Sequence, residues 1–84
     1  MDKGLNAFLA VARGGSITAA ASTINLAQSS VTKRIAALEV ELGIPLFHRD
    51  RRGMSLTEAG EVYLAHAERI EHEYRYGLEE IAVI

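Results

Sequence analysis

The chain has 84 residues, which is long enough for one small domain and too short for two. Apolar residues make up 49% of it, which excludes a disordered chain, and the absence of cysteine excludes disulfides and cysteine zinc sites. No apolar run approaches the ~18 residues of a membrane span, and the N-terminus lacks the pattern of a signal peptide. We therefore expect a cytoplasmic protein with no membrane partner.

The net charge of −2 averages over two unlike parts of the chain. Residues 1–57, here called the head, hold seven Lys and Arg against four Asp and Glu, a net charge of +3. Residues 58–84, here called the linker, hold two against seven, a net charge of −5. The overall acidity argues against a nucleic-acid partner, but the basic head is compatible with one.

The head begins with two predicted helices. In the first, apolar residues recur at helical spacing until Gly14-Gly15 ends the pattern: Leu5, Phe8, Leu9 and Ala12. Ser16 is a suitable N-cap for the second helix. The apolar stripe of that helix is narrow and consists of Ala20, Ala21 and Ile24.

A third helix follows an interruption at residues 25–27. Its buried side is predicted from apolar residues at steps of four, three and four, and Gly43 ends it: Val31, Ile35, Leu38 and Leu42. Two short helices separated by about three residues are the signature of a helix-turn-helix, here at about residues 17–36.

Residues 46–56 predict a small β-hairpin, or wing, because an apolar start is followed by a charged turn with arginines. Thr57 can cap a fourth helix of ~24 residues that meets no breaker before Gly77. This helix carries a seam of about 3.5-residue period, as in a coiled coil: Tyr63, Ala67, Ile70, Tyr74, Gly77 and Ile81. The predicted fold is mainly α, with three helices and a two-stranded wing followed by a long C-terminal linker helix.

The outward face of the third helix carries the candidate chemistry. Gln28 can bond bidentately to an adenine edge, and Lys33 can donate to guanine or phosphate. A helix-turn-helix reads bases mainly through the N-terminal residues of its second helix. A solvated polar face is the common alternative. The turn spacing, the wing and the basic head together favour DNA.

Three segments carry a family resemblance: FLAVARGGSITAAA (8–21), LAQSSVTKRIAALEVELGIPLF (26–47) and FHRDRRGMSLTEAG (47–60). They resemble the N-terminal winged helix-turn-helix of LysR-type transcriptional regulators, over residues 3 to about 82. The resemblance implies sequence-specific binding of double-stranded DNA in bacterial transcription, without a cofactor. The sequence holds no nucleophile motif, phosphate loop or metal-ligand pattern, so we expect no enzyme.

The resemblance also implies residue roles. The base-reading residues are Gln28, Ser29, Thr32 and Lys33. Arg52 of the wing enters the minor groove. The phosphate contacts are Ser16, Thr18, Arg34, Arg49 and Arg51. Some alternatives stay open: Ser16 and Thr18 can act as helix caps, Arg34 can meet a nearby acid, and Arg49 and Arg51 can pair with Asp50 or Glu58.

One position departs from the family pattern. Ala27 stands at the N-cap of the third helix, where Ser is usual, and the lost cap is worth ~1 kcal/mol. Either Asn25 supplies a substitute cap, or the helix start is frayed until DNA orders it.

For the linker, the resemblance implies antiparallel pairing in a homodimer. The two-fold symmetry of such a dimer predicts an interrupted palindromic operator. The dimer contacts would be Tyr63, Ala67, Ile70, Tyr74 and Ile81, or these residues would pack on their own head instead. A small-molecule effector would bind only through a further domain that these 84 residues do not include. The alternative function is a helical protein-interaction module that does not bind DNA, and the acidic pI of 5.9 supports it.

Overall fold

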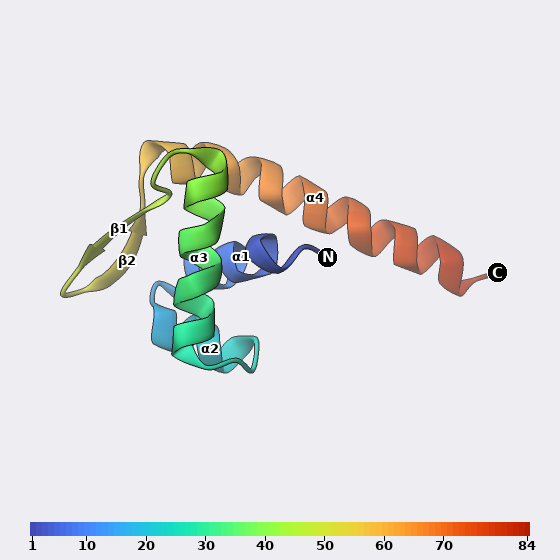
Figure 1. The fold of residues 1–84 in the computed structure, drawn as a ribbon. Helices are drawn as coiled ribbons and strands as arrows, with labels where there is room; N and C mark the ends of the chain where they lie inside the picture. The colour runs from blue at the N-terminus through green and yellow to red at the C-terminus, as the bar shows by residue number, and fades with distance from the viewer.

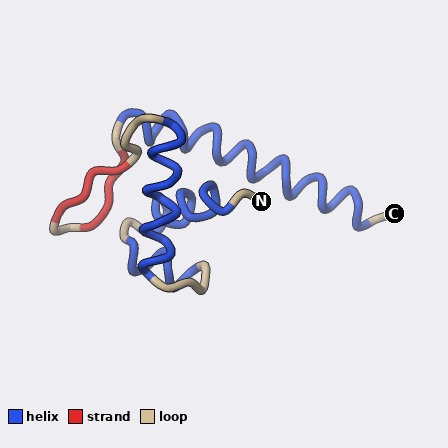
Figure 2. Tube along the Cα trace, viewed as in Figure 1, coloured by secondary structure: helices blue, strands red, loops and turns tan.

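The computed structural model describes residues 1–84 and contains four helices and one hairpin (Figures 1 and 2). In chain order these are α1 (Lys3–Gly14), α2 (Ile17–Thr23), α3 (Gln28–Leu42), β1 (Phe47–Asp50), β2 (Gly53–Leu56) and α4 (Glu58–Ala82). The predicted mainly helical winged fold is confirmed. In Figure 1 the wing lies on one side of the head, and α4 leaves toward the other.

Local signals define the ends of α1 and the start of α2. The Asp2 carboxylate accepts a hydrogen bond from the backbone N–H of Leu5 at 2.9 Å and so caps α1. Gly15 ends α1 with a left-handed φ of 78°, and its N–H donates to the Val11 carbonyl. Ser16 then caps α2, because its hydroxyl accepts from the Ala19 N–H at 3.0 Å.

The turn between α2 and α3 is closed by a Schellman motif at Asn25. The Leu26 N–H donates to the Ala21 carbonyl at 3.0 Å and the Asn25 N–H to the Ser22 carbonyl at 3.4 Å, while Asn25 has a φ of 54°. Asn25 therefore ends α2 and supplies no cap to α3. Ala27 at the start of α3 makes no side-chain cap bond either.

The predicted buried side of α3 is correct for Val31, Ile35 and Leu38 and wrong for Leu42. Leu38 lies beside Gly4 at the start of α1, so one turn later no residue of α1 remains to cover α3. Leu42 is 41% exposed and lines an open apolar groove with Ile44, Val62 and other residues at the start of α4.

The wing is an antiparallel hairpin whose register pairs Phe47 with Leu56 and Asp50 with Gly53. It is attached to the α1–α2 loop, because the Met54 N–H donates to the Gly15 carbonyl at 2.9 Å. Gly53 has a φ of 125°, and a Cβ atom there would lie 2.5 Å from the Gly15 oxygen. Only glycine allows this approach of wing and loop.

The first turns of helix α4 pack against the head. Thr57 caps the helix by accepting from the Gly60 N–H at 3.0 Å, as predicted. Gly60 lies against the Leu46 carbonyl so closely that a Cβ atom would overlap it. The ring of Tyr63 packs edge-on against Phe8, with centroids 4.9 Å apart, and Ala67 is fully buried. The first turns of α4 thus complete the core that the head begins.

No helix of the structure is both long and apolar enough to cross a membrane.

Candidate nucleic-acid interface

The first turns of α3 present a polar face without intramolecular partners. Gln28, Ser29 and Lys33 are exposed and Thr32 is half-buried. None of these four side chains donates or accepts a hydrogen bond, or forms an ion pair, within the chain. Their hydrogen-bonding groups are therefore free for another molecule.

The helix start adds backbone donors to this face. Because Ala27 offers no cap, the backbone N–H groups of Gln28 and Ser29 have no acceptor in the chain. They lie at the positive end of the α3 dipole, where an anion is favoured. Further along, Ala36 and Ala37 are exposed and too small to keep a surface away from the backbone.

The wing presents three arginines, Arg49, Arg51 and Arg52, all exposed. The Asp50 carboxylate accepts from the backbone N–H of Arg52 at 2.8 Å and so closes the hairpin turn. No arginine of the wing forms an ion pair, so the pairing with Asp50 or Glu58 considered above is absent. The three guanidinium groups therefore stay unpaired, and with Asp50 counted the wing has a net charge of +2.

The remaining predicted phosphate contacts differ in their surroundings. Ser16 is the N-cap of α2, which confirms the capping role left open for it above. The side chain of Thr18 is exposed and makes no hydrogen bond. Arg34 is half-buried and shares a hollow with Asp2 and Glu41 near the start of α1, without forming an ion pair.

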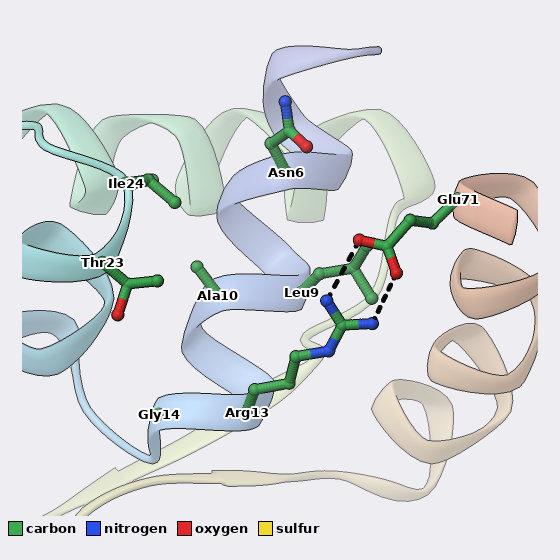
Figure 3. A pocket seen from close by; sticks show the side chains of 8 residues that line it. All are labelled: Asn6, Leu9, Ala10, Arg13, Gly14, Thr23, Ile24 and Glu71. Atoms are coloured by element: carbon green, nitrogen blue, oxygen red, sulfur yellow. Dashed lines mark hydrogen bonds and ion pairs between the residues drawn. The ribbon is translucent and has the colours of Figure 1, made fainter. Parts of the chain in front are cut away.

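Arg13 is the one cation of the head that is neutralised inside the molecule (Figure 3). Its guanidinium donates two hydrogen bonds to the Glu71 carboxylate of α4, at 3.0 and 2.7 Å. These hydrogen bonds hold the pKa of Glu71 below its usual range and raise that of Arg13. The unpaired cations of the head are Lys3, Lys33, Arg34, Arg49, Arg51 and Arg52.

The predicted dimer residues fall into two groups. Ala67 has an exposed fraction of 0% and belongs to the core, so its assignment to a dimer interface is wrong. Tyr63 is half-buried against Phe8, and the same desolvation raises its pKa. Ile70, Tyr74 and Ile81 are exposed by 48%, 48% and 66%.

The prediction for Ala67 is wrong because α4 carries two neighbouring apolar faces, one buried against the head and one exposed, and Ala67 belongs to the buried one. The buried face of α4 is formed by Gly60, Leu64, Ala67 and Glu71, which recur at steps of four, three and four. The unpartnered stripe lies about 60° away on the helix, at one residue per ~100°. It contains Ile70, Tyr74 and Ile81, whereas Ala59 and Tyr63, on the same side but nearer the start of α4, pack against the core.

Two contacts that position this face and the wing are not apparent from the sequence. The Glu39 carboxylate accepts from the backbone N–H groups of Leu46 and Phe47, at 2.6 and 3.3 Å, and holds the start of the wing on α3. The other contact is the Arg13–Glu71 pair. In the sequence, only one observation indicates this pair: the carboxylate Glu71 stands where the spacing of the buried residues of α4 continues.

The structure contains no group of three or more His, Asp or Glu side chains that could hold a metal ion.

The chain is similar to transcription regulators over most of its length. It is 54% identical over 71 residues to the HTH-type transcriptional regulator YofA of Bacillus subtilis, covering 83% of this chain and 25% of the relative. It thus spans about a quarter of the length of the curated relatives it matches.

Solved structures agree with this similarity. The chain has a TM-score of 0.86 and 39% identity to CbnR in the CbnR_DBD–DNA complex, covering 99% of this chain and 98% of that one. For BenM in the BenM_DBD/benA site 1 DNA complex the TM-score is 0.88 and the identity 30%, with 94% and 93% covered.

Residues 3–61 match the family described as bacterial regulatory helix-turn-helix protein, lysR family. This match covers well over half of the chain and includes α1, the helix-turn-helix and the wing. The chain therefore belongs to the LysR family of bacterial regulatory helix-turn-helix proteins.

Proposed function

We propose that this chain is a sequence-specific DNA-binding domain of a bacterial LysR-type transcriptional regulator, which acts as a dimer in the cytoplasm. The observation that carries the proposal is the unpaired polar face of α3 together with the unpaired cations of the wing. The protein is a regulator and not an enzyme.

Helix α3 is the recognition helix in this proposal. Its first turns enter the major groove, where Gln28, Ser29, Thr32 and Lys33 reach base edges. The free N–H groups at the start of α3 suit a phosphate beside the groove. Ala36 and Ala37 let the helix backbone approach the DNA closely.

The wing supplies the second contact. Arg52, at the hairpin tip, is suited to the narrow and negative minor groove. Arg49 and Arg51 flank it and bind phosphates, with Arg34, Ser16 and Thr18 as further backbone contacts. Most of the unpaired cations of the head lie on α3 and the wing, so the positive charge is located where this binding needs it.

Both of the similar structures described above are DNA complexes, of the CbnR and BenM domains. They share most of this chain's length and its fold, which supports a DNA partner for this chain. None of the comparisons favours the alternative of an interaction module without DNA binding.

Dimerisation is supported by the apolar stripe of α4. Ile70, Tyr74 and Ile81 are large, exposed and aligned, and they extend beyond the part of α4 that the head covers. The stripe continues into the apolar groove at Leu42, Ile44 and Val62. Two such chains related by a two-fold axis would bind an interrupted palindrome. A small-molecule effector would act through a further domain outside these residues.

A salt titration of binding to duplex DNA tests the function. Log affinity should fall linearly with log salt concentration, with a slope of about −0.9 for each phosphate contacted. The variant Arg51→Ala/Arg52→Ala should reduce that slope by the equivalent of one to two phosphates. Lys3→Ala, which removes a cation at the start of α1, is the control.

Absence of binding at low salt would reject the DNA-binding function and favour the interaction module. If binding is seen, selection of bound fragments from random duplexes identifies the operator. A single preferred sequence with two related half-sites is the expected result, and selection without any preference would contradict sequence-specific reading.

A further inference from the structure

The direction of α4 is fixed at two separate places on the head. The first is its N-terminal end, where the Thr57 hydroxyl donates to the Pro45 carbonyl at 2.8 Å and its N–H donates to the Leu46 carbonyl at 3.0 Å. Gly60 lies directly against Leu46 there. This end of the helix has no room to shift without moving the backbone.

The second place is the Arg13–Glu71 pair, about 11 residues or ~16 Å further along the helix axis. Arg13 comes from the last turn of α1, beside the α1–α2 loop, and reaches across to α4 (Figure 3). Glu71 is the last residue of the buried face of α4, and after it the helix extends away from the head (Figure 1).

We propose that the Arg13–Glu71 ion pair is a positioning device that sets the angle between α4 and the head, and thereby the spacing of the two DNA half-sites that the dimer accepts. The inference rests on the proposed function, because it takes α4 as the dimer helix and α3 as the recognition helix. It adds a determinant of specificity that touches no DNA.

The geometry of the pair suits this role. Two parallel hydrogen bonds between a planar guanidinium and a carboxylate fix orientation as well as distance. Arg75 approaches Glu71 to 3.7 Å and Glu68 approaches Arg13 to 3.9 Å, so the pair is the centre of a small network. Arg13 is the only residue of the head that forms ion pairs with α4.

A small change in the angle between α4 and the head causes a large displacement of the first turns of the recognition helix. The first turns of α3 lie about one helix length, ~20 Å, from α4, because α3 has 15 residues and it is Leu42, at its C-terminal end, that lines a groove with α4. Rotating the head by about 10° would move a point ~20 Å away by ~3.5 Å, which matches the ~3.4 Å rise between base pairs on one strand. Without the pair, Ala67 is the last tight contact, and the angle is held over a shorter length.

The first arm of the test measures the angle without DNA. The chain has no cysteine, so Ser22→Cys on α2 and Glu80→Cys on α4 accept two spin labels at unique positions. Labelled chain is diluted into excess unlabelled chain, so that each dimer carries one labelled copy. The distance distribution should be narrow, and it should broaden in Arg13→Met and in Glu71→Gln.

The double variant Arg13→Met/Glu71→Gln should broaden the distribution no more than either single variant, since both remove the same contact. Arg69→Met, which removes an arginine of α4 that has no ion-pair partner, should leave it unchanged. Distributions of equal width in all variants would overturn the proposal.

The second arm measures half-site spacing on the selected operator. Inserting or deleting one base pair between the half-sites should weaken the wild-type dimer about tenfold and Arg13→Met or Glu71→Gln only about threefold or less. Binding to an isolated half-site should be equal in all of them, because the pair touches no DNA. Spacing profiles that coincide with the wild type would overturn the specificity role.

The two arms keep this inference distinct from the proposed function. A wild-type chain that binds no DNA but shows the variant-dependent broadening would reject DNA binding and retain the pair as the determinant of the α4 angle. A chain that binds DNA with an unchanged distance distribution would retain the function and reject the inference.

Discussion

Gly53 shows how a single residue connects the wing to the rest of the head. Its φ of 125° is unfavourable for residues with a side chain, and its Cα faces the Gly15 carbonyl. The neighbouring Met54 N–H donates to that same carbonyl at 2.9 Å. The position of the wing arginines relative to α3 therefore depends on two glycines that are 38 residues apart in the sequence.

We expect Gly53→Ala to lower the free energy of unfolding by about 2 kcal/mol or more, from backbone strain and from the overlap with Gly15. It should also weaken DNA binding, because the wing would move away from the loop. Chemical denaturation measures the first effect. Ser55→Ala, an exposed change on the same strand, is the control and should stay within ±0.5 kcal/mol. Equal stability of both variants would contradict the role of Gly53.

Lys33 tests base reading at the residue scale, because its side chain is exposed and unpaired on the outward face of α3. Lys33→Ala should weaken operator binding by ~1–3 kcal/mol and relax the preference at one base pair. Fluorescence anisotropy with operators substituted at each position measures both. Equal loss on every sequence would make Lys33 a phosphate contact instead.

At the scale of the element, the start of α3 is the least stabilised helix start in the chain. Helices α1, α2 and α4 each begin with a side-chain cap, from Asp2, Ser16 and Thr57, whereas Ala27 makes none. The recognition helix nevertheless starts at Gln28, because Val31 and Ile35 anchor its first turns in the core. Tertiary packing thus replaces the missing cap.

Restoring the cap should stabilise the domain. Ala27 has the extended backbone of an N-cap, with φ −66° and ψ 147°, so a serine hydroxyl would reach the free N–H groups without rearrangement. We expect Ala27→Ser to raise the free energy of unfolding by about 1 kcal/mol. Thermal or urea unfolding measures the gain. Ala37→Ser is the control. It lies on the exposed middle of α3, away from the free N–H groups, and should not raise the free energy of unfolding.

At the scale of the whole molecule, charge is separated between the head and α4, and only the Arg13 network joins the two parts by ion pairs. In the proposed DNA-binding function, the acidic flanks of α4 would repel phosphate and favour DNA on the other side of the head. This separation explains how a chain with a pI of 5.9 can present a basic surface.

The Glu71 contribution to stability should depend on pH. Its pKa is lowered in the folded state, mainly by the hydrogen bonds from Arg13, so its contribution is fully present above the ordinary pKa of a glutamate. The contribution is lost as the pH falls through the lowered folded-state pKa. The difference in unfolding free energy between the wild type and Glu71→Gln should therefore shrink between neutral and acidic pH. Glu79→Gln, which lacks an ion-pair partner, should show no such change.

The stripe of α4 predicts the assembly of two chains. Ile70→Asp places a charge in the exposed stripe and should shift the dimer toward monomer, while the fold is retained because Ile70 is 48% exposed. Sedimentation equilibrium gives the dissociation constant, and circular dichroism checks the fold. Tyr76→Asp, at a position of similar exposure about 120° around the helix from Ile70, is the matched control. A dimer that tolerates Ile70→Asp would place the interface elsewhere.

The sequence by itself determined the elements, because caps, glycine stops and apolar spacing are local properties. Gly15, Ser16, Gly43 and Thr57 mark helix ends where the pattern places them, and the outward face of α3 follows from Val31 and Ile35. The family resemblance added the roles proposed for that face.

Only the tertiary structure decided how these elements face one another. A periodic stripe does not reveal which side of α4 meets the head, so the sequence predicts Ala67 at a dimer interface although it is buried in the core. Nor does the spacing in α3 reveal that α1 does not reach Leu42, which is exposed. Nor does the sequence reveal that Gly15 receives the wing, that Glu39 holds its start, or that Arg13 meets Glu71, 58 residues later. Each is a contact between distant segments, and its geometry exists only after the core around Phe8 has formed.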